Sequence, residues 1–174
     1  MKIRTPIRLI ALMGALAVGA TACGGSSSKA APVTKATSTT QDPVKAKVLA
    51  DFNGYADVVT RALADPSVTT QTVSQYLTGD ALDGFTNSRI QLLTSGRVIK
   101  SDAVHHPRVV SVQGATALLS DCVTNNQSHY YAVQGGPHLS DSGDPTAQDE
   151  VTMQMDGGTW KVVKVVRKGT SCSA

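Results

Sequence analysis

A short apolar run near the N-terminus, followed by a cysteine, most constrains what this chain can fold into. Three basic residues lie within the first eight positions, and residues 9–19 are apolar or small. A run of about 11 residues is typical of the central part of a secretion signal and is too short to cross a bilayer as a permanent helix. We therefore expect residues 1–22 to be removed as a signal peptide, so that the folded protein begins after them.

The residues around the cleavage position indicate what happens to Cys23. The segment Ala20-Thr21-Ala22-Cys23 resembles the lipobox of bacterial lipoproteins, although Ala20 stands where that motif more often has leucine. The resemblance implies that Cys23 is diacylated and anchors the mature protein to the extracytoplasmic face of the cell membrane. The alternative is secretion without a lipid, because Ala-x-Ala also suits the ordinary signal peptidase. Residues 23–41 are rich in Gly, Ser, Thr and Pro, and we expect a flexible linker.

The charge of the mature chain excludes one class of partner. Removing Lys2, Arg4 and Arg8 leaves 13 of the 16 basic residues, which equals the 13 Asp and Glu residues. A neutral domain without a basic cluster lacks the electrostatic surface that nucleic acid binding needs. We therefore expect no nucleic acid partner. The membrane is the expected partner, through the lipid anchor, and an envelope protein is a further kind of partner that this location allows.

Two more cysteines, Cys122 and Cys172, form an even pair in a chain that leaves the cytoplasm. Oxidising compartments favour disulfides, and a pair of cysteines in an exported domain is typically joined. Two buried free thiols are the alternative, because spacing alone does not set the geometry of a disulfide. We predict a disulfide between Cys122 and Cys172.

Apolar periodicity predicts that the first half of a domain spanning residues 42–174 is helical. Asp42-Pro43 is a typical helix start, and apolar residues then recur every three or four positions until Asp65-Pro66. A second helix is expected over about residues 69–79. A third is expected to start with Asp80 as its cap and to end at Ser95-Gly96.

The second half of the domain changes to strand periodicity. We expect four strands, at residues 97–100, 108–112, 115–123 and 129–133. The Gly-, Pro- and Ser-rich residues 134–148 predict a long loop. Alternation from Val151 onward, a turn over 156–159 and a returning strand predict a final hairpin. We expect either a bulge near Val163 or burial of the strand on both sides, because Lys164 would otherwise share the face of Trp160 and Val162.

This order of elements resembles a known family. Together with segments 77–82, 107–112, 120–123 and 158–162, it is similar to small secreted proteins and lipoproteins of actinobacteria that carry an NTF2-like, cystatin-like cone domain. The similarity covers about residues 43–174. It implies an α+β fold in which two to three N-terminal helices pack on a curved antiparallel sheet. The resemblance implies no particular biochemical role.

Enzymes with an NTF2-like fold often hold an Asp or His at the pocket in the mouth of the cone. The candidates that this resemblance implies here are Asp102, His105, His129 and Tyr130. An Asp–His pair within hydrogen-bond reach could act as a general base. His106 follows His105, and neighbouring side chains in a strand point to opposite faces, so both cannot serve one site.

The motifs that identify other chemistries are absent from the sequence. A metal site built from Asp102, His105, His129 and His138 lacks the spacings typical of zinc ligands. No phosphate-binding loop and no Gly-x-Ser-x-Gly element is present. We therefore predict no catalytic residue, no cofactor and no metal. The hypothesis is a non-catalytic binding or structural module of the cell envelope. The alternative is a small-molecule-binding protein or an enzyme that uses the cone pocket.

The lipid anchor generates the first prediction. Replacing Cys23 by serine removes the only thiol that the signal positions for acylation, so Cys23→Ser protein should move from the membrane fraction to the soluble extracytoplasmic fraction. Cell fractionation followed by immunoblotting measures this. Unchanged membrane association of the variant would contradict the anchor.

Overall fold

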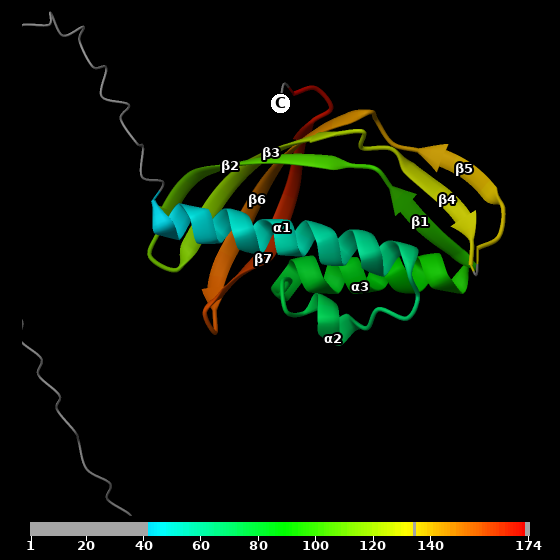
Figure 1. Ribbon diagram of the computed structural model, residues 1–174, viewed down its shortest axis with the longest axis horizontal. Helices are drawn as coiled ribbons and strands as arrows, with labels where there is room; N and C mark the ends of the chain where they lie inside the picture. The colour runs from blue at the N-terminus through cyan, green and yellow to red at the C-terminus, as the bar shows by residue number, and fades with distance from the viewer. Residues whose placement is uncertain (1–41, 134, 173–174) are drawn as a thin grey trace, which may run out of the picture. The chain divides into compact units, whose positions relative to one another are not determined.

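The computed structural model describes residues 42–133 and 135–172, so the predicted signal peptide, Cys23 and the predicted linker lie outside the described residues. Three helices come first, followed by seven strands: α1 (Pro43–Ala64), α2 (Thr70–Val73), α3 (Gly79–Thr94), β1 (Arg97–Ser101), β2 (Val104–Gln113), β3 (Thr116–Thr124), β4 (Ser128–Ala132), β5 (His138–Ser142), β6 (Thr146–Asp156) and β7 (Thr159–Gly169). The domain is α+β, with its helices packed on antiparallel sheets (Figure 1). No described helix is long and apolar enough to cross a membrane.

Helix α1 has the predicted start and end. The carboxylate of Asp42 accepts a hydrogen bond from the Val44 amide at 2.9 Å, which satisfies one of the free N–H groups at the helix start. The helix stops before Pro66, as expected from the effect of proline on the preceding residue. Val48 and Phe52 on its buried face are fully inaccessible to solvent, and they fix the helix against the sheet.

The next two helices differ from the prediction. The second is a single turn, α2, because the chain that follows it pairs with β7 instead. The Thr78 amide donates to the Val162 carbonyl at 3.0 Å, and the Val162 amide donates to the Tyr76 carbonyl at 2.8 Å. Helix α3 starts at Gly79, with Thr78 at the cap position, so Asp80 lies in the first turn and is not the cap.

Two antiparallel sheets follow, in the strand orders β2-β3-β6-β7 and β1-β4-β5. The two sheets are linked by three bends in the chain. Each bend joins a strand of one sheet to a strand of the other after two or three residues: β1 to β2, β3 to β4 and β5 to β6 (Figure 1). At the bend Asn125 and Gly143 have positive φ values of 52° and 97°. The Asn126 amide donates to the Pro145 carbonyl at 2.9 Å, which ties neighbouring bends together.

The prediction of a loop over residues 134–148 is wrong. This segment contains all of β5 and the start of β6. Every residue of β5 is exposed, so the strand shows no alternation of apolar and polar residues that the sequence could reveal. It forms through backbone pairing with β4, in which Ser128 lies opposite Ser142.

The last hairpin confirms the predicted turn and bulge. Gly157 and Gly158 have positive φ values of 58° and 86°, as a tight hairpin turn requires. Met153 pairs with Val162 and Thr152 with Lys164, which leaves Val163 as the extra residue of a bulge.

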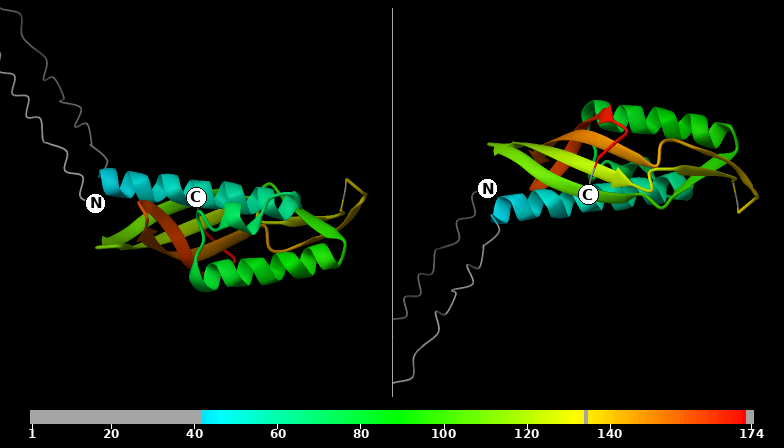
Figure 2. Two further views of the ribbon diagram at one scale, coloured as in Figure 1. Left: turned by 90° about the horizontal axis from the view of Figure 1, so that it is seen from below. Right: turned by 90° about the horizontal axis from the view of Figure 1, so that it is seen from above.

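The helices cover one face of the sheets, and the C-terminal segment crosses the other face (Figure 2). The main core lies between α1 and the four-stranded sheet and includes Phe52, Leu119, Met153 and Trp160. The Trp160 amide also donates to the Asp51 carboxylate at 2.8 Å, so the first helix and the last strand are joined directly.

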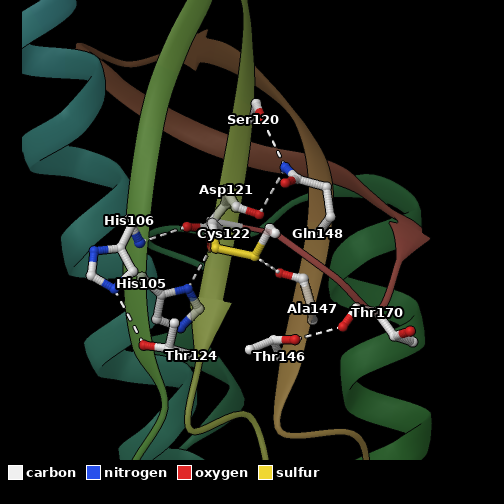
Figure 3. Close-up of a disulfide and its surroundings, with 11 residues drawn as sticks. His105, His106, Ser120, Asp121, Cys122, Thr124, Thr146, Ala147, Gln148 and Thr170 are labelled. Atoms are coloured by element: carbon white, nitrogen blue, oxygen red, sulfur yellow. Dashed lines mark hydrogen bonds and ion pairs between the residues drawn. A yellow bond between two sulfur atoms is a disulfide. The ribbon is translucent and has the colours of Figure 1, made fainter. Parts of the chain in front are cut away.

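The predicted disulfide is present between Cys122 in β3 and Cys172 near the C-terminus, with the two Cα atoms 5.7 Å apart. It lies on the face of the sheet away from α1 (Figure 3). Nearby, the Thr146 hydroxyl donates to the Thr170 carbonyl at 2.5 Å. Together these contacts hold the C-terminal segment against β3 and β6.

Loss of this disulfide should destabilise the domain. It spans 50 residues, for which the entropy of loop closure sets an upper value of about 4 kcal/mol. The double variant Cys122→Ala/Cys172→Ala should therefore unfold at a clearly lower urea concentration than the parent protein, followed by circular dichroism. Dithiothreitol should lower the parent's midpoint and leave that of the variant unchanged; equal midpoints for both proteins would contradict a stabilising role.

Candidate functional site

The four residues predicted around one pocket lie apart from one another. Asp102 is exposed in the turn between β1 and β2, and His105 in β2 is half-buried. His129 and Tyr130 are successive residues of β4, so their side chains leave opposite faces of that strand. Tyr130 lines a hollow beside α3, whereas His129 contacts β5. The structure therefore does not bring these four side chains together.

His105 instead pairs with Asp121 of β3. Its Nδ1 lies 2.6 Å from Oδ2 of Asp121, a carboxylate that is only 1 % exposed. The other carboxylate oxygen accepts the His106 amide at 2.9 Å. His105 is paired with Val123 in the ladder, so Asp121 is its diagonal neighbour on the face toward α1. Asp121 thus holds the ring of His105 in one orientation (Figure 3).

His106 points the other way, as the sequence predicts. Its Nε2 lies 3.3 Å from the Thr124 hydroxyl, on the face of the sheet that carries the disulfide (Figure 3). The two histidines therefore cannot act on one bound molecule.

His105 lines a small cavity of about 180 Å³ at the bend of the strands, here called the bend pocket. Its walls come from α1, both sheets and the connections between them: Val59, Thr60, Leu63, Ile99, Ser101, Ala103, His105, Val123, Asn126, Ser128 and Asp149. Asp149 is already paired with Arg167, whose Nε lies 2.5 Å from its carboxylate. A histidine fixed by a buried carboxylate has the geometry of a general base. The cavity, however, is smaller than the roughly 300–1,000 Å³ of typical ligand sites.

A larger hollow of about 450 Å³ lies between α1, α3 and β7 and is here called the helix groove. It is lined mainly by apolar side chains, with one acid and one base: Tyr55, Val59, Leu77, Asp80, Ala81, Gly84, Phe85, Lys164 and Val165. A Cβ added at Gly84 would meet no atom within 4 Å, so this helical glycine leaves the wall of the groove open. Glycine inside a predicted helix was the one signal in the sequence that could have pointed to this groove.

Tyr55 is one of the residues that line the helix groove, and its hydroxyl group has a raised pKa. Burial raises the pKa of Tyr55 to about 12, and the negative charges of Asp149 and Asp121 add to the rise. Its ring contacts that of Phe52, with the centroids 5.5 Å apart. The phenol therefore stays protonated at physiological pH and can donate a hydrogen bond.

No family model matches the sequence, and no curated protein matches it. Among solved structures, the intermembrane space region of chloroplast protein ARC6 is similar, with a TM-score of 0.55 and 13% identity over 71% of this chain and 95% of that one. The Kfla4162 protein from Kribbella flavida gives a TM-score of 0.45 at 11% identity, over 71% of this chain and 90% of its own. At these identities the likeness to ARC6 concerns the fold alone.

The pKa of Tyr55 predicts a specific loss of stability at alkaline pH. The unfolded chain releases the phenol proton at about pH 10, and the folded chain releases it only at about pH 12. The contribution of this group to the free energy of unfolding is therefore complete below pH 10 and is lost as the pH rises to 12. The melting temperature of Tyr55→Phe should consequently fall less steeply over this range than that of the parent protein. If the melting temperatures of the two proteins fall equally with pH, the pKa of Tyr55 is not raised in the folded protein.

Proposed function

We propose that this chain is a lipid-anchored extracytoplasmic protein whose NTF2-like domain is a non-catalytic binding module, with the helix groove as its ligand site. The observation that carries the proposal is the groove itself. Its volume of about 450 Å³ lies within the range of ligand sites, and its mainly apolar walls with a few polar groups are typical of them.

The anchoring part of the proposal depends on the signal and Cys23 in the sequence. The disulfide between Cys122 and Cys172 supports it, because such bonds persist in oxidising compartments outside the cytoplasm. A tethered domain searches only a thin shell beside the membrane, which raises its effective concentration toward envelope components.

The NTF2-like part depends on the order of elements. Three helices precede antiparallel strands, and the strands bend so that the sheets curve around the helices (Figure 1). The resemblance of the sequence to NTF2-like proteins implies the same arrangement, and a fold of this kind leaves hollows between helices and sheet in which a ligand can lie.

The walls of the helix groove indicate the kind of ligand. Leu77, Phe85 and Val165 offer an apolar surface, so the ligand needs an apolar body. Lys164 and Asp80 add one charge of each sign. A small amphiphile with an anionic or hydroxylated head group matches this combination.

A second function is favoured by one observation, the pairing of His105 with the buried Asp121. This pair could serve an enzyme that removes a proton from a small substrate in the bend pocket. We rank it below binding because the pocket holds only about 180 Å³ and because Asp149 in its wall is neutralised by Arg167.

Filling the helix groove should abolish binding. In Gly84→Leu the new side chain extends into open space, and the melting temperature should not fall, since leucine favours a helix over glycine by roughly 0.8 kcal/mol. We expect the variant to bind 8-anilinonaphthalene-1-sulfonate, an amphiphile with one sulfonate, at least tenfold more weakly than the parent protein, as measured by fluorescence titration.

Asn87→Leu is the matched control, because Asn87 is exposed on the same helix and does not line the groove. It should bind the probe like the parent protein, as should His105→Gln. Equal weakening in Gly84→Leu and Asn87→Leu would contradict the groove as the site. Turnover of a small molecule that is lost in both His105→Gln and Asp121→Asn, with folding retained, would favour the enzyme instead.

A further inference from the structure

Three side chains converge on the hairpin formed by β4 and β5, away from both hollows described above. The Nδ1 of His129 and the Nε2 of His138 each lie 2.7 Å from the same oxygen, Oδ1 of Asp141. One nitrogen or oxygen from each of the three residues lies within 4.8 Å of the others. The two histidines are nine residues apart in the sequence and meet only because the hairpin folds back.

A β-bulge brings His138 to this position. His129 lies opposite Asp141 and Tyr130 opposite Ser140, but Tyr131 then pairs with His138 and skips Leu139. In a regular ladder Leu139 would face Tyr131, and His138 would point to the other side of the sheet. Bulges that redirect a side chain are common next to functional sites. The irregularity therefore places a second imidazole beside His129.

We propose that His129, His138 and Asp141 form a binding site for a divalent transition metal ion, with Zn²⁺ as the reference ion. Two imidazoles and one carboxylate are a ligand set that zinc takes in proteins, with water in the fourth position. His138 and Asp141 are exposed, so a water molecule can reach the open side.

To hold the ion, the three ligand atoms must move from hydrogen-bond distances to the separations around a tetrahedral centre, starting from positions within 4.8 Å of one another. Around tetrahedral zinc with bonds of about 2.0–2.1 Å, ligand atoms lie roughly 3.4 Å apart, so Asp141 would retreat by about 0.7 Å from each nitrogen. The ring of Tyr131 contacts His138 edge-on, with centroids 5.3 Å apart, and helps to orient it.

One cation lies near the site and must be accommodated. Lys100 is opposite His129 in the ladder, and its ammonium group lies 4.5 Å from the centroid of the Tyr131 ring. The electron-rich face of that ring attracts the ammonium group and keeps it on the aromatic side chain. The other reading of the cluster is a metal-free hydrogen-bonded clip, in which Asp141 accepts one N–H from each histidine and stabilises the hairpin.

Titration of the mature protein with ZnCl₂ by isothermal calorimetry tests the proposal. The protein carries Cys23→Ser and no histidine tag, so that neither a free thiol nor the tag binds zinc. We expect one zinc ion per chain and a higher melting temperature with zinc than with EDTA, because an ion that binds the folded state stabilises it. His138→Gln and Asp141→Asn should each weaken binding at least tenfold. The melting temperature in EDTA shows whether the variants remain folded.

His106→Gln is the matched control, because its ring is bonded to Thr124 on another strand pair, and it should bind zinc like the parent protein. Mg²⁺ should produce no heat, since it prefers oxygen ligands. If the parent protein takes up no zinc, or if His138→Gln and Asp141→Asn bind it as the parent does, the proposal is wrong. If the variants are less stable than the parent protein in EDTA, and zinc has no effect on the parent protein, the cluster is a hydrogen-bonded clip and not a metal site.

Discussion

The bend in three neighbouring strand pairs is the constraint on which the rest of this structure depends. At the bend the Asn126 amide is bonded to the Pro145 carbonyl, and Gly143 adopts a φ of 97°. A Cβ at Gly143 would lie 3.3 Å from the Asn126 carbonyl oxygen, so the close approach of the two bends suits glycine. Because the strands change direction here, the four-stranded sheet packs on α1 while β1 of the other sheet contacts both α1 and α3, and the bend pocket lies at the junction.

The elements whose apolar residues recur at a regular spacing in the sequence could be predicted. Helix α1 repeats apolar residues at helical spacing, and the last hairpin alternates around two glycines. The bulge at Val163 followed from the conflict between Trp160, Val162 and Lys164. Strand β5 could not be predicted, because all its side chains are exposed and only its backbone pairing with β4 defines it. The second helix is also shorter than the sequence predicts, because backbone pairing with another strand ends it. Val162 in β7 forms backbone hydrogen bonds with the residues on both sides of Leu77.

The candidate sites were less accessible to sequence reasoning than the fold. His105 was identified, but its partner was expected among residues such as Asp102 and is in fact Asp121, sixteen positions away on the neighbouring strand. Likewise Asp141 joins His129 only through the register of β4 and β5. Which carboxylate meets which imidazole depends on ladder register and bulges, and neither is expressed in the spacing of the residues themselves.

The bond between the Trp160 amide and the Asp51 carboxylate joins positions 109 residues apart, and it has a consequence for biogenesis. The first helix packs on the last strand, so the main core cannot close until nearly the whole domain has left the ribosome. Contacts this distant in sequence form slowly. A chain that emerges from its N-terminus therefore cannot complete this core until the last hairpin is available, and Cys172, which follows β7, reaches Cys122 last of all.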